Sequence, residues 1–326
     1  MAKNVEGPKH RIVSMLPSAS EMICLVGGES ELVGRSHEDD FPATIMHLPI
    51  LTGQKTVFTS SADVDRQVSE ALTQGQSLYT IDADTLKALK PTAIVTQDLC
   101  NVCAIDLVTV ERISQTMSPA PHIITLNPQN LDDVISDVRR IGEELGYKEG
   151  ARKAQESLQN RIEAAKTSGA RLLQSKAGGV RPRVLFIEWT DPIFFGGHWT
   201  PQLIHMAGAD QPIAPATDEE GAGPSRRVTH EACIATRPQI VVICPCGLSL
   251  VDAKRETDLI AGKEWFLKMT APDSDGNAVR VVIVDGNQMF NRPGPRLVDA
   301  LEFLVGYIWD EPELIPAGFP YERYLN

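Results

Sequence analysis

The feature that most constrains this chain is one long helical run, from Leu131 to about Ser168, which contains no proline. Apolar side chains recur through its first half at helical spacing, at Val134, Val138, Ile141 and Leu145. The Gly146–Tyr147 pair can break the run into two helices. The run is therefore either an ordinary crossover helix inside one domain or a connector between two lobes.

Short apolar segments alternate with helical segments on both sides of this run. The expected strands are Arg11–Leu16, Glu31–Arg35, Pro49–Thr52, Thr92–Thr96, His122–Leu126, Arg183–Trp189, Gln239–Ile243 and Val279–Val284. A weak internal repeat, TLKALKPTAIVTQDLC and EACIATRPQIVVICPC, has the same order of helix, basic residue, proline, strand and cysteines. The pattern predicts an α/β fold of two Rossmann-like lobes with mainly parallel sheets. We expect lobes over residues 1–128 and 171–326, bridged by a helical connector over residues 129–170.

Helix boundaries can be predicted from capping residues. Ser18 or Ser20 is expected to cap a helix over Glu21–Val26, after a turn at Pro17. Asp82 or Asp84 is expected to cap the short helix that follows it. A helix is also expected at Thr200–Ala207 and a final one at Arg296–Trp309, before a tail broken by prolines.

Charge and hydropathy exclude several classes of partner. A net charge of -12 over 326 residues argues against nucleic acid, which requires a concentrated basic surface. No stretch approaches the roughly 20 apolar residues of a membrane span. The first residues, MAKNVEGPKHRIVSML, lack the apolar core of a secretory signal. We therefore expect a cytoplasmic protein, with a periplasmic location only if the native N-terminus is longer.

Polar loops follow several of the expected strands, where open α/β sheets bind their ligands. The loop Ser36–Asp40 places His37 beside three carboxylates, Glu38, Asp39 and Asp40. Such a cluster can bind a metal or a cationic group. The alternative is a solvated loop with a helix cap, which is the more common role of such a segment.

A family resemblance covers Arg11 to about Ile308. The segments RIVSMLPSASEMICLVG, VGRSHEDDFP, LKPTAIVTQDLCNVCA, EWTDPIFFGGHWTPQLIHMAGA and VDGNQMFNRPGPRLVDALE occur in collinear order. In this respect the chain resembles the cobalamin- and siderophore-type (vitamin B12-type) substrate-binding proteins of ABC importers, in a form without an export signal. The resemblance implies a class III periplasmic-binding-protein-like fold, with two α/β lobes bridged by one long helix and a ligand cleft between the lobes.

The resemblance also implies which residues bind the ligand, and the side-chain chemistry of Gln97, just after an expected strand, adds it to them. They are Pro17, Ser18, Ser20, His37, Asp39, Asp40, Gln97, Trp189, Phe195, His198, Trp199, Asn287, Phe290 and Arg292. The aromatic rings could cover a flat apolar ligand, with core packing as the alternative. The amide and hydroxyl groups could bind polar edges, and Arg292 a phosphate or carboxylate unless it forms a structural salt bridge. His37 or His198 could bind a transition metal such as a corrin cobalt.

Six cysteines lie at positions 24, 100, 103, 233, 244 and 246. Cys24 and Cys233 fall in expected helices and are interpreted as small buried apolar residues. The other four, Cys100, Cys103, Cys244 and Cys246, come from equivalent loops and could bind zinc, an iron–sulfur cluster or the metal of a cofactor. Reduced, partly buried thiols are the alternative.

Three functions remain open. The preferred one is a cytosolic protein that binds a corrinoid or related metal chelate as carrier, sequestering protein or sensor. The second is an ABC-importer binding protein, in which Glu231 would dock onto permease arginines, as the resemblance implies. The third is an enzyme or metal-binding protein that uses His37, Asp39 or the cysteines. No nucleophile elbow, phosphate-binding glycine loop or HExxH pattern is present, so the sequence does not favour an enzyme.

Overall fold

The chain divides into two units, each built around its own sheet. The computed structural model describes residues 10–98 and 107–325. Unit 1 comprises Met1–Phe58, Arg66–Pro128 and Asp133–Ser157, and unit 2 comprises Thr59–Asp65, Gln129–Asp132 and Leu158–Asn326. Within the described ranges, no helix has the length and apolar character needed to cross a membrane.

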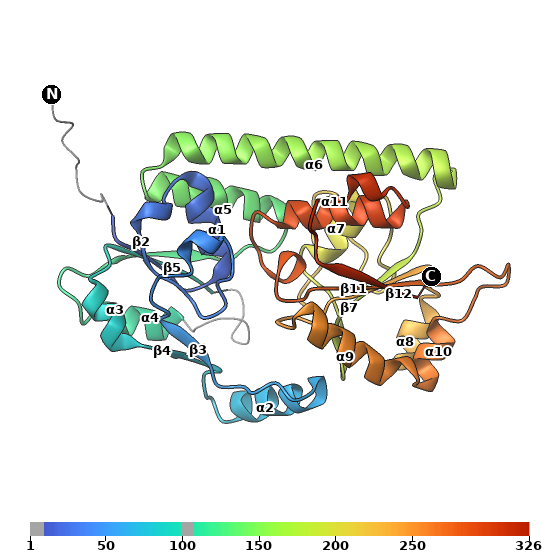
Figure 1. Ribbon diagram of the computed structural model, residues 1–326, viewed down its shortest axis with the longest axis horizontal. Coiled ribbons are helices and arrows are strands. Elements are labelled where there is room, and N and C mark those ends of the chain that lie inside the picture. The colour runs from blue at the N-terminus through green and yellow to red at the C-terminus, as the bar shows by residue number, and fades with distance from the viewer. Residues whose placement is uncertain (1–9, 99–106, 326) are drawn as a thin grey trace. The chain divides into compact units, whose positions relative to one another are not determined.

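A four-stranded parallel sheet forms the centre of unit 1, with the strand order β2-β1-β5-β6. Figure 1 labels two of its strands, β2 and β5. Its strands are β1 (Ile12–Ser14), β2 (Leu32–Gly34), β5 (Ala93–Gln97) and β6 (His122–Leu126). The helices between them are α1 (Pro17–Val26), α3 (Ala83–Leu89) and α4 (Leu107–Ser114). A separate antiparallel pair consists of β3 (Thr52–Gln54) and β4 (Tyr79–Ile81).

A six-stranded sheet forms the centre of unit 2, with the order β12-β11-β10-β7-β8-β9. The parallel strands are β7 (Val184–Thr190), β10 (Ile240–Ile243) and β11 (Arg280–Val284). The antiparallel strands β8 (Ile193–Phe195), β9 (Arg226–Arg227) and β12 (Tyr321–Leu325) extend it. The helices are α7 (Thr200–Met206), α8 (His230–Ala235), α9 (Leu250–Ala261), α10 (Glu264–Met269) and α11 (Leu297–Ile308).

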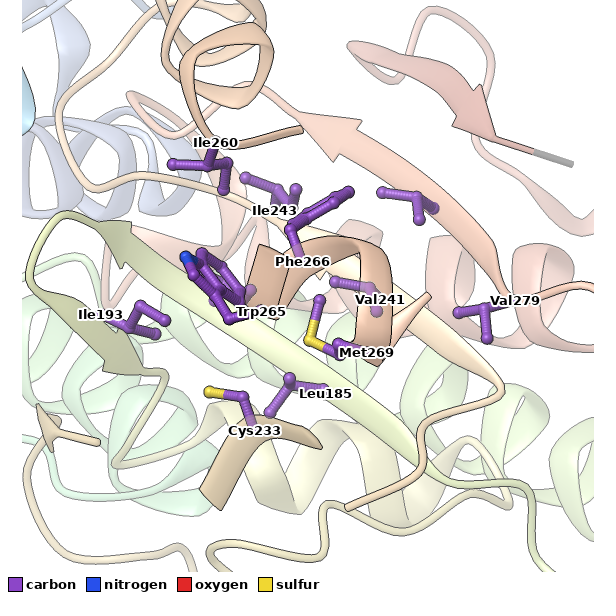
Figure 2. Packing of buried hydrophobic residues seen from close by; sticks show 12 residues of the cluster. Leu185, Ile193, Cys233, Val241, Ile243, Ile260, Trp265, Phe266, Met269 and Val279 are labelled. Carbon is purple, nitrogen blue, oxygen red and sulfur yellow. The ribbon is translucent and has the colours of Figure 1, made fainter. Parts of the chain in front are cut away.

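The parallel strands of unit 2 are buried on both faces. Side chains such as Leu185, Val241 and Val281 pack with Trp265 and Phe266 of α10 in one apolar cluster (Figure 2). Continuous runs of Val, Ile and Leu are the expected composition of strands covered on both sides. The predicted α/β class is confirmed in both units, and the prediction of mainly parallel sheets is confirmed for the four-stranded sheet of unit 1. The sheet of unit 2 is mixed, because its three central strands are parallel and its other three pairings are antiparallel.

The long helical run is two helices, α5 (Leu131–Glu144) and α6 (Lys148–Ala177). Gly146 has a φ of 79°, a left-handed conformation that ends α5, as the sequence indicated. The residues of α6 up to Ser157 belong to unit 1 and the rest to unit 2. Within unit 1 a Cβ atom on Gly150 would lie 1.9 Å from the carbonyl oxygen of Val26, so this close approach of α6 to α1 requires glycine.

The capping prediction at α1 is wrong. The helix begins at Pro17 with Leu16 as its N-cap, so Ser18 and Ser20 lie inside the helix. Proline favours the first helical position because its fixed φ suits the helix and its missing N–H is not needed there. At α3 the predicted cap is confirmed, since Asp82 accepts a hydrogen bond from the backbone N–H of Thr85.

Two strands lie where the sequence pattern indicated loops. The aromatic segment after β7 turns back as β8, and the tail ends in β12, which pairs with β11. Both strands depend on hydrogen bonds to a partner strand, and such pairing leaves little local signal. The internal repeat is confirmed as α3-β5 and α8-β10, with Lys90 and Arg237 both at positive φ before a proline.

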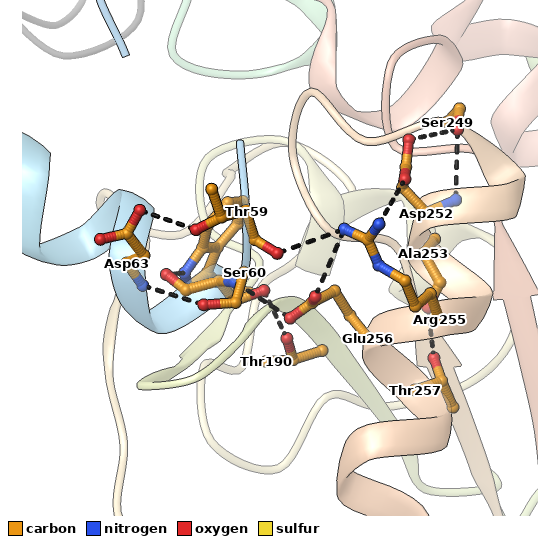
Figure 3. A network of polar contacts seen from close by, with 12 residues as sticks. Thr59, Ser60, Asp63, Thr190, Ser249, Asp252, Ala253, Arg255, Glu256 and Thr257 are labelled. Atoms are coloured by element: carbon orange, nitrogen blue, oxygen red, sulfur yellow. Dashed lines mark hydrogen bonds and ion pairs between the residues drawn. The ribbon is translucent and has the colours of Figure 1, made fainter. Parts of the chain in front are cut away.

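The first residues of α2 (Ser61–Thr73) belong to unit 2 rather than unit 1. The backbone N–H of Ser61 donates to Oε2 of Glu256 at 3.0 Å, and its hydroxyl lies 2.8 Å from that of Thr190 (Figure 3). Arg255 donates to the carbonyl oxygen of Thr59 at 3.4 Å. The segment Thr59–Asp65 is therefore fixed on unit 2 by long-range polar contacts.

Candidate ligand-binding site

The carboxyl ends of β1, β2 and β5 lie at one edge of the unit 1 sheet, because the three strands are adjacent and parallel. We call this the unit 1 edge. It brings together predicted residues from three distant parts of the chain. They are Pro17, Ser18 and Ser20 on α1 after β1, His37, Asp39 and Asp40 after β2, and Gln97 at the end of β5.

Several polar atoms at this edge are buried without a hydrogen-bond partner among residues 10–98 and 107–325. They are Oγ of Ser18, Oγ of Ser20, Nε2 of His37 and Oε1 of Gln97. Buried polar atoms in proteins are nearly always paired with protein groups, ordered water or a ligand. These atoms are therefore the buried hydrogen-bonding groups of this edge that the described residues leave unused.

The loop after β2 is held in shape by two buried side chains. Asp39 accepts hydrogen bonds through Oδ2 from the backbone N–H and the hydroxyl of Ser36, at 2.8 and 2.6 Å. The guanidinium group of Arg35 donates to the carbonyl oxygens of Ser36, Asp39 and Met46. Asp39 thus has a structural role in the loop, whereas Asp40 is exposed.

His37 is oriented by Thr52, at the start of β3. Oγ1 of Thr52 lies 2.9 Å from the backbone nitrogen of His37 and 2.7 Å from its Nδ1. Burial lowers the pKa of His37, so the imidazole is neutral at neutral pH. Its Nε2 lies 3.9 Å from Oε1 of Glu38, beyond hydrogen-bonding distance. A neutral imidazole held through one nitrogen can bind a transition metal through the other.

The carboxyl ends of β7, β10 and β11 lie together at one edge of the unit 2 sheet. Trp189, at the end of β7, is partly exposed and donates from Nε1 to the carbonyl oxygen of Ser61 at 3.2 Å. Asn287, after β11, is also partly exposed, and its backbone N–H donates to Asp285. Arg292 is buried in the turn that precedes α11.

Three predicted aromatic residues are buried in unit 2. Phe195 and Phe290 are each 1% exposed, and Trp199 is 6% exposed. The ring of Phe290 packs 5.0 Å from that of Phe186, and Nε1 of Trp199 donates to the carbonyl oxygen of Phe290 at 2.7 Å. These contacts favour the alternative of core packing over coverage of a ligand.

In the sequence, His198 lies between Phe195 and Trp199. Its backbone has an uncommon conformation, with a φ of 50°. Its ring stacks on Trp199 with centroids 5.5 Å apart, and burial lowers its pKa. Nδ1 of His198 is buried without a partner in the described part of the chain. His198 is therefore a second neutral imidazole, but no hydrogen bond of its ring fixes its tautomer.

The two cysteines of the loop after β10 lie in different environments. Cys244 is buried, its Sγ lies 3.6 Å from the carbonyl oxygen of Asp285, and Asn291 donates to it at 3.5 Å. Burial raises the pKa of Cys244, which favours the thiol over the thiolate that metals require. Cys246 is exposed.

Zinc or iron binding by the loop cysteines stays a prediction. Cys100 and Cys103 lie outside the described residues. Within 10–98 and 107–325, no three His, Cys, Asp or Glu side chains are grouped to hold a metal ion. Of the two cysteines expected in helices, Cys233 is buried as predicted and Cys24 is partly exposed.

Two residues of this region were not anticipated from the sequence. Thr52 orients His37 from 15 positions away, and Tyr79 of β4 places its ring 5.9 Å from the imidazole. Neither belongs to a recognisable motif. The parallel bridge between Arg35 and Ile50 brings Thr52 to His37, and the pairing of β3 with β4 adds Tyr79. Glu231, the predicted docking residue, is exposed in the first turn of α8.

The fold of the chain is that of solved periplasmic binding proteins. A periplasmic heme-binding protein from Pseudomonas aeruginosa superposes with a TM-score of 0.67 at 21% identity, over 97% of this chain and 98% of that chain. The apo form of the periplasmic heme-binding protein RhuT from Roseiflexus sp. RS-1 gives 0.63 at 21% identity, over 92% and 98%. The periplasmic vitamin B12-binding protein BtuF of Vibrio cholerae gives 0.63 at 18% identity, over 94% and 99%.

These similarities confirm the fold expected from the resemblance. At such identities the similarities show the fold alone. They do not identify the ligand of this chain. No protein-family model matches the chain. No curated protein matches it either.

Proposed function

We propose that this protein binds a metal chelate, a corrinoid in the first place, and that His37 is its axial metal ligand. The observation that carries the proposal is the state of the His37 imidazole. Nδ1 is held by Thr52 at 2.7 Å, Nε2 has no hydrogen-bond partner among the described residues, and burial keeps the ring neutral. Cobalt and iron in tetrapyrrole rings take such a nitrogen as an axial ligand.

The neighbouring polar atoms suit the edges of such a ligand. The hydroxyl groups of Ser18 and Ser20 can donate to carbonyl or carboxylate oxygens, and Oε1 of Gln97 can accept from an amide. Corrinoids carry amide groups around the ring, whereas hemes carry carboxylates. Oε1 of Gln97 suits the amide groups of a corrinoid, while the hydroxyl groups of Ser18 and Ser20 suit either ligand.

The fold supports a binding role. Its solved relatives include proteins named for heme and for vitamin B12. For this chain we propose the role of a carrier, sequestering protein or sensor.

The test is a titration of the purified, reduced protein with hydroxocobalamin and, separately, with hemin, followed by visible absorbance and calorimetry. We expect saturable binding of hydroxocobalamin with a spectral change typical of imidazole coordination. His37→Ala should abolish the spectral change and weaken binding by at least about tenfold. The exposed His47 provides a matched control, because His47→Ala removes an imidazole outside the unit 1 edge.

Three outcomes separate the alternatives. Loss of the spectral change in His198→Ala but not in His37→Ala would show that His198 of unit 2, and not His37, binds the metal. Saturable binding of hemin but not of hydroxocobalamin would show that the ligand is a heme and not a corrinoid. Absence of heat and of a spectral change at high micromolar concentrations of both ligands would refute the proposal.

A further inference from the structure

A cavity of about 600 Å³ lies in unit 2 at the C-terminal end of α11. It is lined by Lys176, Arg280, Ile308, Trp309, Asp310 and Arg323, and we call it the α11 pocket. Its cationic groups come from α6, β11 and β12. Arg280 is the first residue of β11, so the pocket lies at the amino end of that strand, opposite the carboxyl edge considered above.

Arg280 is a partly buried cation, and Asp310, another residue of the pocket lining, is an acidic neighbour that forms no close ion pair with it. Its guanidinium group donates to the carbonyl oxygens of Tyr307 at 2.9 Å and Ile308 at 2.7 Å. Within the described ranges no carboxylate lies within 4.0 Å of it, and its other N–H groups have no partner. Charges taken out of water are normally paired, so this group can accept an anion.

A second guanidinium group, that of Arg323, contacts the same aromatic ring as Arg280. The Cζ atoms of Arg280 and Arg323 are 5.4 and 5.7 Å from the centroid of the Tyr307 ring. Arg323 is paired with Asp310 at 3.2 Å, but both side chains are largely exposed, so this ion pair is weak. Two like charges at one ring repel each other, and an anion between them would relieve that repulsion.

Hydrogen bonds to the last carbonyl groups of α11 account for the positions of some of the cationic side chains in the α11 pocket. Cations near a helix C-terminus interact favourably with its last carbonyl groups, and Lys176 donates to the carbonyl oxygen of Trp309 at 2.6 Å. Lys176 is also paired with Glu311 at 2.7 Å. Capping does not account for Arg323, which bonds to no carbonyl of the helix, nor for the unused donors of Arg280.

We propose that the α11 pocket binds a small dianionic oxyanion, either inorganic phosphate or the phosphate group of a phosphate monoester, between Arg280 and Arg323. Arginine suits such a group because its planar array of donors matches the geometry of phosphate oxygens. The pocket is open to solvent and has room for a phosphate group. This site is independent of metal-chelate binding, since it shares none of the residues proposed above.

Calorimetric titration with inorganic phosphate at constant ionic strength, with chloride as the reference salt, tests the proposal. We expect saturable binding to the wild-type protein and a rise in Tm that chloride does not reproduce. Arg323→Gln should weaken phosphate binding by at least about tenfold. Arg152→Gln is the matched control, because Arg152 is an exposed arginine of α6 paired with Glu149 and Glu156.

A second substitution, Arg280→Lys, keeps the charge but removes the planar donor array, and should also weaken binding. If it impairs folding, Arg323→Gln still decides the question, because Arg323 is largely exposed. Parallel titrations with a phosphate monoester distinguish the two sources of the phosphate group. Absence of saturable binding of both anions, or equal binding by Arg323→Gln and Arg152→Gln, would overturn the proposal. Binding of hydroxocobalamin should be unchanged in all three variants.

Discussion

The Nδ1 atom of His37 lies 2.7 Å from Oγ1 of Thr52, and the same oxygen lies 2.9 Å from the backbone nitrogen of His37. One hydroxyl group thus fixes both the ring and the main chain of the histidine that we propose as the metal ligand. Partners of this kind orient a metal-binding imidazole and determine which nitrogen faces the metal.

Thr52→Val should weaken the binding of hydroxocobalamin by about 10- to 100-fold, because the imidazole loses the group that orients it. Titration by visible absorbance measures the change. Thr80→Val is the control, since Thr80 is an exposed threonine of β4, in the same small sheet, whose hydroxyl bonds only to the carbonyl oxygen of Gly53. Unchanged affinity of Thr52→Val for hydroxocobalamin would show that Thr52 does not position the His37 imidazole for metal binding.

Asp137 on α5 should make stability depend on pH. It is buried, its Oδ2 has no partner among the described residues, and desolvation raises its pKa to about 6. The folded state therefore holds the proton more tightly than the unfolded state, and the free energy of unfolding falls as the pH rises from about 4 to about 6. Above pH 6 Asp137 is ionised in both states, and the loss in the free energy of unfolding no longer grows. We expect this loss to be about 1–2 kcal/mol after allowance for partial solvation of the carboxylate.

Asp137→Asn should remove this dependence, raising Tm above pH 6 and leaving it unchanged near pH 4. Thermal unfolding at several pH values measures the effect. Glu143→Gln on the same helix is the control, because Glu143 is exposed and is not among the charges that shift the pKa of Asp137. Identical Tm profiles for wild type and Asp137→Asn would contradict the prediction.

Phe266 and Leu267 are neighbours on α10 with opposite environments, since Phe266 is 1% exposed and Leu267 is 57% exposed. Phe266→Ala should lower the free energy of unfolding of unit 2 by about 3–5 kcal/mol, because it leaves a cavity in the cluster of Figure 2. Leu267→Ala should change it by less than about 0.5 kcal/mol. Denaturant unfolding followed by tryptophan fluorescence compares the two, and equal losses would show that α10 does not pack as described.

Glu256 should determine how firmly the segment Thr59–Asp65 is held on unit 2. Glu256→Ala removes the acceptor for the N–H of Ser61 (Figure 3), so the amides of this segment should exchange with deuterium about tenfold faster. Hydrogen-exchange mass spectrometry measures the rates. Glu264→Ala is the control, because Glu264 is an exposed carboxylate of α10. Equal exchange in both variants would exclude the role assigned to Glu256.

Much of the architecture could be predicted from the sequence. The strands β1, β5, β6, β7, β10 and β11 lie within a residue or two of the apolar segments that predicted them. The break between α5 and α6 lies at the predicted Gly146–Tyr147 pair. These features depend on periodicity and on glycine conformation, which are properties of a few neighbouring residues.

The candidate site could be predicted only in outline. Loops at the carboxyl ends of parallel strands identified His37, Ser18 and Gln97, because chain direction alone places those loops at one edge. The roles of the aromatic residues could not be separated in this way. Phe290 follows a strand, as a binding residue would, but its ring packs against Phe186 in the core of unit 2.

The sequence by itself determined the α/β architecture and the division of the long helical run, because the spacing of apolar residues and the position of glycine determine both. Only the tertiary structure decided that Thr52 orients His37 and that Glu256 fixes the first turn of α2. It also decided that Arg280 and Arg323 meet at Tyr307. Each of these contacts joins residues whose approach depends on strand pairing and packing across the whole unit, which no short stretch of sequence encodes.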